Sequence, residues 1–153
     1  MATEEEFEVE SMHFTRLLLA VDDDDDESSR RAFNYASTLA KIYNIPLGIV
    51  SVLETGDLNI YQSLSPDILS ARRSEIAAHL NTYVEKAERF GVQDAQPIIG
   101  EGKPARVILD EVLPEFKPDL IILGSHKQRG HLHIGSVASE IMRSAEASVI
   151  VVR

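Results

Sequence analysis

Apolar residues follow two different patterns along this chain. Short continuous apolar runs, of the kind that form strands buried on both faces, occupy residues 17–21, 47–53, 95–99, 120–123 and 148–152. Between these runs, apolar residues recur three and four positions apart, as in amphipathic helices, at residues 28–43, 66–90, 104–113 and 137–142. This strict alternation predicts an α/β fold, a doubly wound five-stranded parallel sheet with helices on both faces.

Turn residues set the boundaries of the first two predicted helices. Asn44 suits the left-handed position at the end of the first helix, and Pro46 prevents that helix from continuing. Ser65 and Pro66 form a typical helix start, with serine as the N-cap and proline at the first helical position. Gly91 is expected to end this second, long helix.

Prolines also delimit the second half of the chain. Pro97 lies inside the third strand and cannot donate to a ladder, so that strand is predicted at a sheet edge. Pro104 opens the third helix, which Pro114 and Pro118 are expected to close. Ser136 is the expected N-cap of the last helix. The predicted core comprises Leu18, Val21, Val50, Val52, Ile121, Ile122 and Ile150.

Composition restricts the compartment and the partners. The chain has 153 residues, enough for one domain, and no cysteine, which excludes disulfides and thiolate metal sites. Residues 1–13 are rich in glutamate and are expected to form a flexible acidic tail before a domain at residues 14–153. No basic leader or apolar span of about 20 residues is present, so we expect a cytoplasmic protein. A net charge of −10 argues against nucleic acid or a membrane as partner.

The clearest candidate site follows the fourth strand. The apolar run at residues 120–123 leads into a loop with Gly124, Gly130 and Gly135, and then into a helix starting near Ser136. Glycines let backbone amides approach a ligand, and a helix N-terminus adds free N–H groups and partial positive charge. The segment therefore suits an anion. A P-loop is disfavoured because the lysine of that motif is missing. In the structural alternative, the glycines serve only turns and close packing.

The topology predicts which residues share this site. In a doubly wound sheet, ligands bind outside the carboxyl ends of the strands, where the strand order reverses. If the first and fourth strands flank that point, Asp22 and Gly124 face one crevice.

Several separate segments resemble the universal stress protein family over residues 15–153. The motifs that carry the resemblance are Ala20-Val21-Asp22, Ser29-Arg30-Arg31-Ala32, Gly102-x-Pro104-x3-Ile108, Asp119-Leu120-Ile121-Ile122-Leu123-Gly124-Ser125-His126, Gly135-Ser136-Val137-Ala138 and Val149-Ile150-Val151-Val152. The resemblance implies strand order 3-2-1-4-5 in a Rossmann-like, adenine-nucleotide alpha hydrolase-like architecture. It also implies a homodimer in which the C-terminal strands pair.

Members of the family that bind ATP carry the pattern Gly-x2-Gly-x9-Gly-Ser/Thr, and this chain departs from it. Lys127 stands where the second glycine is expected, and seven residues separate it from Gly135 where the pattern has nine. The loop after the first strand, commonly Asp-Gly-Ser in the family, is acidic throughout and about two residues longer here.

The resemblance also assigns candidate ligand contacts. Asp22, the backbone of Val52 and Leu123 would contact adenine and ribose. Gly124, Gly135 and Ser136 would contact phosphate, with Lys127 beside them. A left-handed backbone at Lys127 would cost roughly 1–2 kcal/mol, and a lost amide bond to phosphate about 1.5–3 kcal/mol, together on the order of 100-fold in affinity. We therefore expect weak or no binding of ATP, with Lys127, Arg129 or a Mg²⁺ ion held by the acidic loop offsetting part of the loss.

Other candidate sites have simpler explanations. His126, His131 and His133 are close in sequence, but no acid in their loop completes a metal site, so exposed loop histidines are favoured. The acidic run at residues 22–26 lacks the spacing of an EF-hand and is read as a solvated loop rather than a Mg²⁺ or Ca²⁺ site.

Two functional classes remain open. One is a dimeric stress-response module, with an unidentified protein partner, that binds ATP weakly or not at all. The alternative is a nucleotide-responsive stress protein. An enzyme is disfavoured because no hydrolase elbow, metalloprotease motif or general base can be named.

Overall fold

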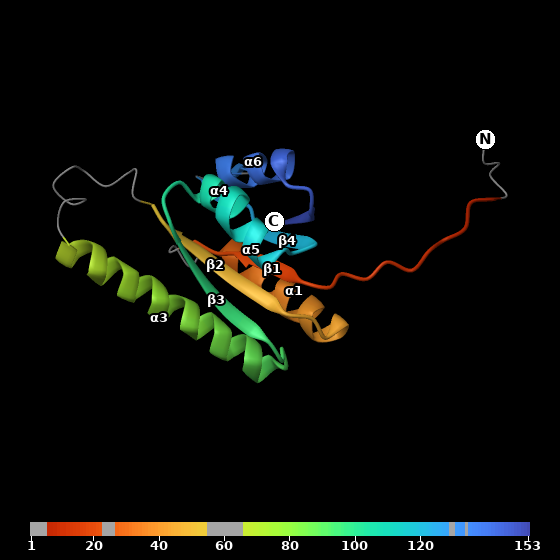
Figure 1. Cartoon of the computed structure of the whole chain (residues 1–153), viewed down its shortest axis with the longest axis horizontal. Helices are drawn as coiled ribbons and strands as arrows, with labels where there is room; N and C mark the ends of the chain where they lie inside the picture. Colours follow the sequence, from red (N-terminus) through yellow and green to blue (C-terminus); the bar gives the residue numbers. More distant parts are fainter. Residues whose placement is uncertain (1–5, 23–26, 55–65, 129–130, 134) are drawn as a thin grey trace.

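The computed structural model describes residues 6–22, 27–54, 66–128, 131–133 and 135–153. Its central sheet has five parallel strands in the order β3-β2-β1-β4-β7, which confirms the predicted order 3-2-1-4-5 (Figure 1). The strands are β1 (Leu17–Ala20), β2 (Leu47–Leu53), β3 (Ala95–Glu101), β4 (Leu120–Gly124) and β7 (Ser148–Val152). The edge position predicted from Pro97 is therefore also confirmed.

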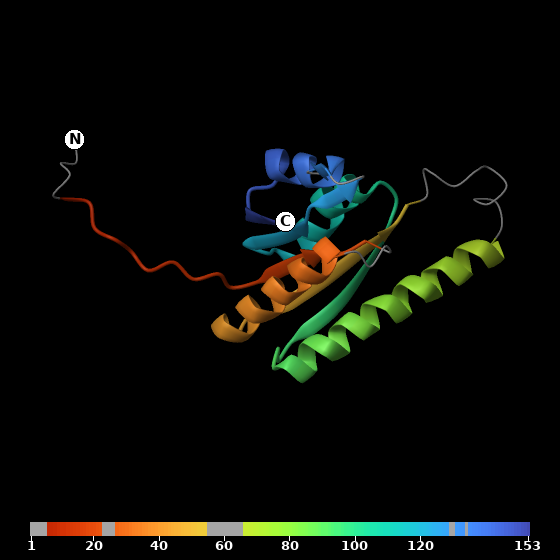
Figure 2. The same ribbon diagram turned by 180° about the vertical axis from the view of Figure 1, so that it is seen from behind.

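Helices cover both faces of the sheet (Figures 1 and 2). The helices α1 (Glu27–Tyr43) and α3 (Pro66–Phe90) pack on one face. On the other face lie α6 (Ser136–Ser144) and a continuous helical segment made of α4 (Pro104–Val107), the π-helical turn η2 (Ile108–Val112) and α5 (Leu113–Phe116). The predicted doubly wound α/β fold is confirmed.

Alternate side chains of β1 supply the two cores. Leu17 and Leu19 pack with the helix α1, whereas Leu18 packs with Ile121 and the helical segment on the other face. Because parallel strands in such a fold are buried on both faces, their apolar runs are continuous. Of the predicted core residues, five are at most 4% exposed: Leu18, Val21, Val50, Ile121 and Ile122. Val52 and Ile150 are only partly buried, at the rims of the two clusters.

The predicted helix boundaries are confirmed at three places. Asn44 has φ 54° and Gly91 has φ 123°, so both take left-handed positions immediately after a helix. The helix α4 begins at Pro104, and Lys103 is its N-cap. The predicted N-cap at Ser65 lies outside the described residues.

The prediction that Pro114 ends the third helix was wrong. The helix continues to Phe116 and ends at Lys117, which has φ 54° and precedes Pro118. The N–H of Leu113 bonds to the carbonyl of Ile108 across the wider turn η2. Such a π-helical turn relieves the clash that a proline ring makes with the carbonyl four residues earlier. Proline also lacks an N–H, and the absent donor costs less where the helical hydrogen bonds are already irregular.

The last helix begins one residue earlier than predicted. Gly135, with φ −58° and ψ 156°, is the N-cap of α6, and its carbonyl accepts the N–H of Ser139 at 3.0 Å. Ser136 is thus the first helical residue and not the N-cap, and no side chain caps this end. The loop before it also contains an unpredicted antiparallel pair, β5 (His126–Gln128) and β6 (His131–His133).

The chain before β1 runs away from the sheet (Figure 1). Phe7 and Val9 are 85% and 98% exposed in this segment. Whether residues 1–13 form a separate flexible tail stays a prediction. Across the parts of the chain that the structure describes, no helix has the length and apolar character needed to cross a bilayer.

Candidate functional site

A small crevice lies where the carboxyl ends of β1 and β4 meet the starts of α1 and α6. It is lined by Ala20, Asp22, Ser28, Ser29, Leu123, Gly124, Val137 and Ala138. This is the switch point of the sheet, since the chain crosses from β1 to β2 on one side and β4 lies on the other. The predicted meeting of Asp22 with Gly124 is therefore found. The volume of the crevice is ≈ 40 Å³, far below the roughly 300–1,000 Å³ of ordinary small-molecule sites.

The start of α1 accounts for the small size of the crevice. A β-carbon built on Gly124 would lie 2.9 Å from the carbonyl oxygen of Ser28 and 3.2 Å from the amide nitrogen of Ser29. Both serines are buried, at 7% and 6% exposure. Because Gly124 has no side chain, the backbone of α1 can approach the strand β4. At this position the glycine therefore has the packing role that was the structural alternative in the sequence analysis.

Two helix N-termini meet at this crevice. Ser28 and Ser29 belong to the first turn of α1, and Val137 and Ala138 to the first turn of α6. Each helix start carries a partial positive charge. The crevice is thus electrostatically suited to an anion, although the carboxylates of Asp22 and Glu27 lie at the same end of the sheet.

The other predicted contacts do not line the crevice. Val52 lies in β2 opposite Gly100 and packs at the rim of the core. Gly135 and Ser136 immediately precede the lining residue Val137.

Lys127 lies in β5, opposite Leu132 in β6. The non-glycine residues with positive φ in the described part of the chain are Asn44 and Lys117. Lys127 therefore does not have the strained left-handed backbone that the sequence analysis considered. It lies in a β-strand instead, where any residue can adopt the backbone conformation.

Five lining residues were not predicted as ligand contacts: Ala20, Ser28, Ser29, Val137 and Ala138. The sequence indicates Ser28 and Ser29 only as a helix start, and the other three only as members of the motifs that carry the family resemblance. The position of the two serines, directly after the acidic loop, could have indicated that they line the site, since the helix start that follows a first strand faces the switch point. Their close approach to Gly124 depends on how α1 packs on the sheet, and no local sequence pattern predicts it.

Two carboxylates of the described residues have a lowered pKa, and both lie away from the crevice. Asp119, at the opposite end of β4 from Gly124, accepts hydrogen bonds from the N–H of Thr15 at 3.0 and 2.8 Å, from its hydroxyl at 3.0 Å and from the N–H of Arg16 at 3.0 Å. Partial burial alone would raise the pKa of Asp119, but these donors together lower it. This carboxylate fastens the start of β1 to the start of β4.

The second perturbed carboxylate is Glu101 at the end of β3. Its hydrogen bond from the guanidinium of Arg73, in α3, lowers the pKa of Glu101. A carboxylate whose pKa is lowered by partners is stabilised in its charged form, so neither Glu101 nor Asp119 is poised to exchange protons near neutral pH. No cluster of three or more metal-ligating side chains occurs among the described residues. The side chains of His126, His131 and His133, and residues 23–26 of the acidic run, lie outside that set.

The sheet order and the crevice at its switch point define a Rossmann-like α/β protein. Within that class the chain belongs to the universal stress protein family, because the model of that family matches residues 13–153. A protein of Staphylococcus aureus (strain USA300), assigned by its name to the universal stress proteins, is 29% identical over 142 residues. The match covers 92% of this chain and 84% of that protein.

Solved structures share the fold. The universal stress protein UspA from Lactobacillus plantarum matches with a TM-score of 0.76 at 23% identity, covering 94% of this chain and 100% of that chain. The universal stress protein from Archaeoglobus fulgidus, solved in complex with dAMP, matches with a TM-score of 0.67 at 19% identity, covering 93% and 100%. At these identities the likeness establishes the fold alone.

Proposed function

We propose that this protein is a dimeric, non-enzymatic stress-response module of the cytoplasm whose adenine-nucleotide crevice binds ATP weakly or not at all. The observation that carries the proposal is the ≈ 40 Å³ crevice, which the first turn of α1 fills against Gly124. A nucleotide would have to displace this turn, whose serines are buried. Displacing packed backbone adds a cost that an open site does not have.

The segment after β4 supports the same conclusion. In the ATP-binding pattern of the family it supplies the phosphate contacts, whereas here residues 126–128 pair with residues 131–133 as two short antiparallel strands. In such a pair the amides of alternate residues bond to the other strand, and those amides are not free to bond to phosphate. The seven-residue spacing between Lys127 and Gly135 thus accompanies a segment that pairs as two strands.

The alternative is a nucleotide-responsive stress protein. It is favoured by the Archaeoglobus fulgidus relative, which has the same fold and was solved in complex with dAMP. Two helix N-termini at the crevice also suit a phosphate. In this alternative the ligand would open the crevice by moving α1 away from Gly124.

Calorimetry with Mg-ATP, and separately with AMP, tests the proposal on the unaltered protein. We expect a dissociation constant on the order of tens of micromolar or weaker for Mg-ATP, because one lost amide bond to phosphate, about 1.5–3 kcal/mol, weakens a micromolar family-like site by about ten-fold or more. AMP tests adenosine binding without the β and γ phosphates. Submicromolar binding of either nucleotide would overturn the proposal in favour of the alternative, and so would a nucleotide identified by mass spectrometry in protein purified from cells.

The non-enzymatic part has its own test. Asp119 and Glu101, the carboxylates of lowered pKa among the described residues, are held in the charged form away from the crevice. We therefore expect incubation of the protein with Mg-ATP to release ADP no faster than buffer does. Release in proportion to protein concentration, retained through a final gel-filtration step, would contradict this part of the proposal.

The dimer is proposed to form through β7. This strand is the sheet edge opposite β3, and its sequence, Ser-Val-Ile-Val-Val, is apolar. Val149, Ile150 and Val151 are each only partly buried in the single chain. An apolar edge with unpaired backbone groups favours pairing with a second strand, and pairing of identical edges gives a closed two-fold dimer.

A further inference from the structure

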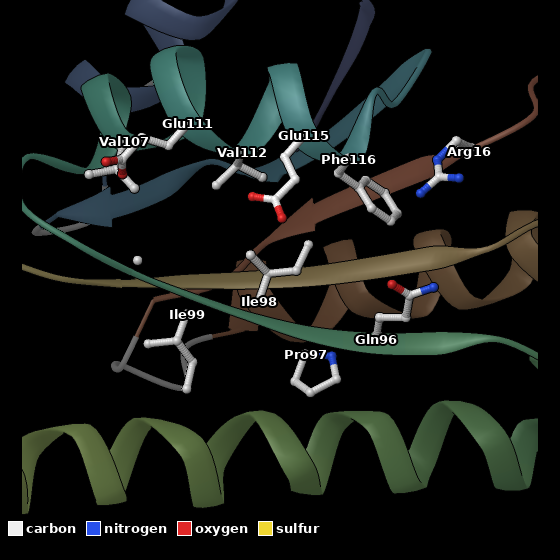
Figure 3. Close-up of a pocket in the computed structure, with 11 residues that line it drawn as sticks. Arg16, Gln96, Pro97, Ile98, Ile99, Val107, Glu111, Val112, Glu115 and Phe116 are labelled. Carbon is white, nitrogen blue, oxygen red and sulfur yellow. The ribbon is translucent and has the colours of Figure 1, made fainter.

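A groove with a volume of ≈ 860 Å³ lies between the edge strand β3 and the helical segment α4–η2–α5 (Figure 3). Five consecutive strand residues, 96–100, line it. Side chains alternate between the two faces of a strand, so a run of consecutive lining residues means that the groove follows the edge of the strand itself. The opposite wall is one side of the helical segment, lined by Val107, Glu111, Val112, Glu115 and Phe116.

The backbone at this edge has unused hydrogen-bonding groups. Leu47 donates to the carbonyl of Asp94 at 2.8 Å, and Gly102 donates to the carbonyl of Leu53 at 2.9 Å. In a parallel ladder with the observed register, even-numbered residues of β3 therefore bond to β2 and odd-numbered residues direct their N–H and C=O groups outward. Ile99 thus presents both groups at the free edge. Pro97 is also an outward position, where its missing N–H costs no ladder bond.

The helical wall gives the groove its charge. Glu111 and Glu115 are exposed, and neither has an ion-pair partner among the described residues. Glu115 reaches from α5 toward Ile98, whereas Pro97 and Ile99 point toward α3 (Figure 3). At the far end the guanidinium of Arg16 lies 4.4 Å from the centroid of the Phe116 ring. The groove is therefore acidic along the helix and basic at one end.

We infer that this groove binds an extended segment of a partner protein with a basic–apolar–basic sequence, which adds to the sheet beside β3. Residues four apart on a helix are about 6 Å apart along its axis, and alternate residues of a strand are about 6.6 Å apart. Two basic side chains on the helical face of the added strand therefore match Glu111 and Glu115. The intervening apolar side chain points to the other face, where Ile99 is 44% exposed.

Arg16 and Pro97 restrict how the segment can lie. A third cation near Gln96 would be repelled by Arg16, so the basic pair is placed on the two glutamates. Because Pro97 offers only its carbonyl, the strongest backbone pairing falls on Ile99. Addition of a strand to an exposed sheet edge is a common mode of peptide recognition, in which the backbone supplies affinity and alternate side chains supply specificity.

This inference names a partner class for the stress-response module proposed above and rests on that proposal. Its test does not involve nucleotide, so failure here leaves the calorimetry with Mg-ATP unaffected. The probe is a fluorescein-labelled peptide with blocked ends, Gly-Ser-Lys-Val-Lys-Ser-Gly, measured by fluorescence anisotropy at low salt. The control peptide, Gly-Ser-Lys-Lys-Val-Ser-Gly, has the same composition with adjacent lysines. We expect the alternating peptide to bind about five-fold more tightly, or better.

Two sets of variants locate the site. The double variant Glu111→Gln with Glu115→Gln should weaken binding about five-fold or more, whereas Glu8→Gln with Glu10→Gln, which removes the same charge from exposed residues before β1, should not. Ile99→Pro removes the outward N–H without touching the β2 ladder and should weaken binding about ten-fold, whereas Ile99→Thr keeps that N–H and should stay within about three-fold. Circular dichroism and melting temperature establish that each variant is folded.

Several results would overturn the inference. Equal binding of the two peptides would show only non-specific attraction to an acidic protein. Equal loss in the groove variants and in the Glu8 and Glu10 variant would have the same meaning. No detectable binding at millimolar protein would show that the groove does not bind such a segment. If Ile99→Pro does not fold, the two charge variants decide the matter alone.

Discussion

The backbone of Ser28 occupies the space in which a side chain on Gly124 would lie. The distance from a built β-carbon to the Ser28 carbonyl oxygen is 2.9 Å, too short for any real β-carbon. Gly124 is also the first glycine of the family's ATP-binding pattern. In this chain its conformational freedom is not needed for a left-handed turn, since its φ is not among the positive values, and close packing explains the glycine without a ligand.

Gly124→Ala is therefore predicted to destabilise the fold. The clash is with backbone, which cannot rotate away, so we expect the free energy of unfolding to fall by about 1–3 kcal/mol. Urea denaturation at neutral pH measures this difference. Ser136→Ala is the control, because Ser136 is exposed and makes no cap bond, and it should change stability by less than about 0.5 kcal/mol. Equal stability of the two variants would mean that α1 does not approach β4 so closely.

The carboxylate of Asp119 is predicted to stabilise the fold at neutral pH and to lose that effect in acid. Asn in its place keeps one acceptor oxygen but loses the charge that the N–H groups of Thr15 and Arg16 share. Bonds to a charged group contribute about 1.5–3 kcal/mol, and with partial exposure we expect Asp119→Asn to cost about 1–2 kcal/mol.

The sign of the pH dependence follows from the direction of the shift. The pKa of Asp119 is lowered in the folded state, so its contribution is fully present above the unfolded-state value of about 3.9 and is lost as the pH falls through the lower, folded-state value. The stability difference between wild type and Asp119→Asn should thus be constant from about pH 5 to 8 and shrink below about pH 4. A difference that grew in acid would refute this account.

The sheet could be predicted from the sequence because its signal is repeated within each element. Continuous apolar runs located all five strands, and Pro97 located an edge. The prediction from Pro114 was wrong because proline usually ends a helix, whereas here a π-helical turn accommodates it. Such a turn depends on how the segment packs on the sheet, which the local sequence does not show.

The site was harder to predict than the fold. Asp22 and Gly124 meet as the topology requires, but the volume between them depends on the approach of α1. After β4 the sequence predicts a glycine-containing loop, whereas the structure has the paired strands β5 and β6. Their pairing brings Lys127 opposite Leu132, and Gly130 is the one turn residue between them in the sequence. The groove beside β3 has no signal in the sequence, because strand and helix residues distant in sequence form it together.

Ile121→Asp is predicted to prevent folding. Ile121 is fully buried at 0% exposure in the central part of the sheet, and an unpaired buried carboxylate costs several kcal/mol against a total stability of roughly 5–15 kcal/mol. Ile42→Asp is the matched control, since Ile42 is 69% exposed, and it should melt within a few degrees of the wild type. A soluble Ile121→Asp protein with the wild-type melting temperature and circular dichroism would mean that the assignment of β4 to the core is wrong.

Val151→Lys is predicted to dissociate the proposed dimer. A lysine in the apolar edge strand β7 would place its charge in the interface, whereas the same change at Ile99, on the opposite edge, should leave the dimer intact. Sedimentation velocity at micromolar concentration measures the mass of each protein. The prediction fails if the wild type is already monomeric there, or if Ile99→Lys dissociates it equally.

The last prediction is that lengthening the segment after Lys127 restores nucleotide affinity. Because Lys127 lies in a strand without a left-handed backbone, replacing it by glycine relieves no strain, and Lys127→Gly alone should change the affinity for Mg-ATP by less than about three-fold. Lys127→Gly with two residues inserted between Gly130 and Gly135 restores the family's spacing and frees backbone amides for phosphate. One recovered bond to a charged group corresponds to about ten-fold tighter binding or more. Calorimetry of the three proteins under one buffer distinguishes the outcomes. If the lengthened variant binds no better than Lys127→Gly, the closure of the crevice by α1 against Gly124, and not the spacing of the loop, is what limits affinity.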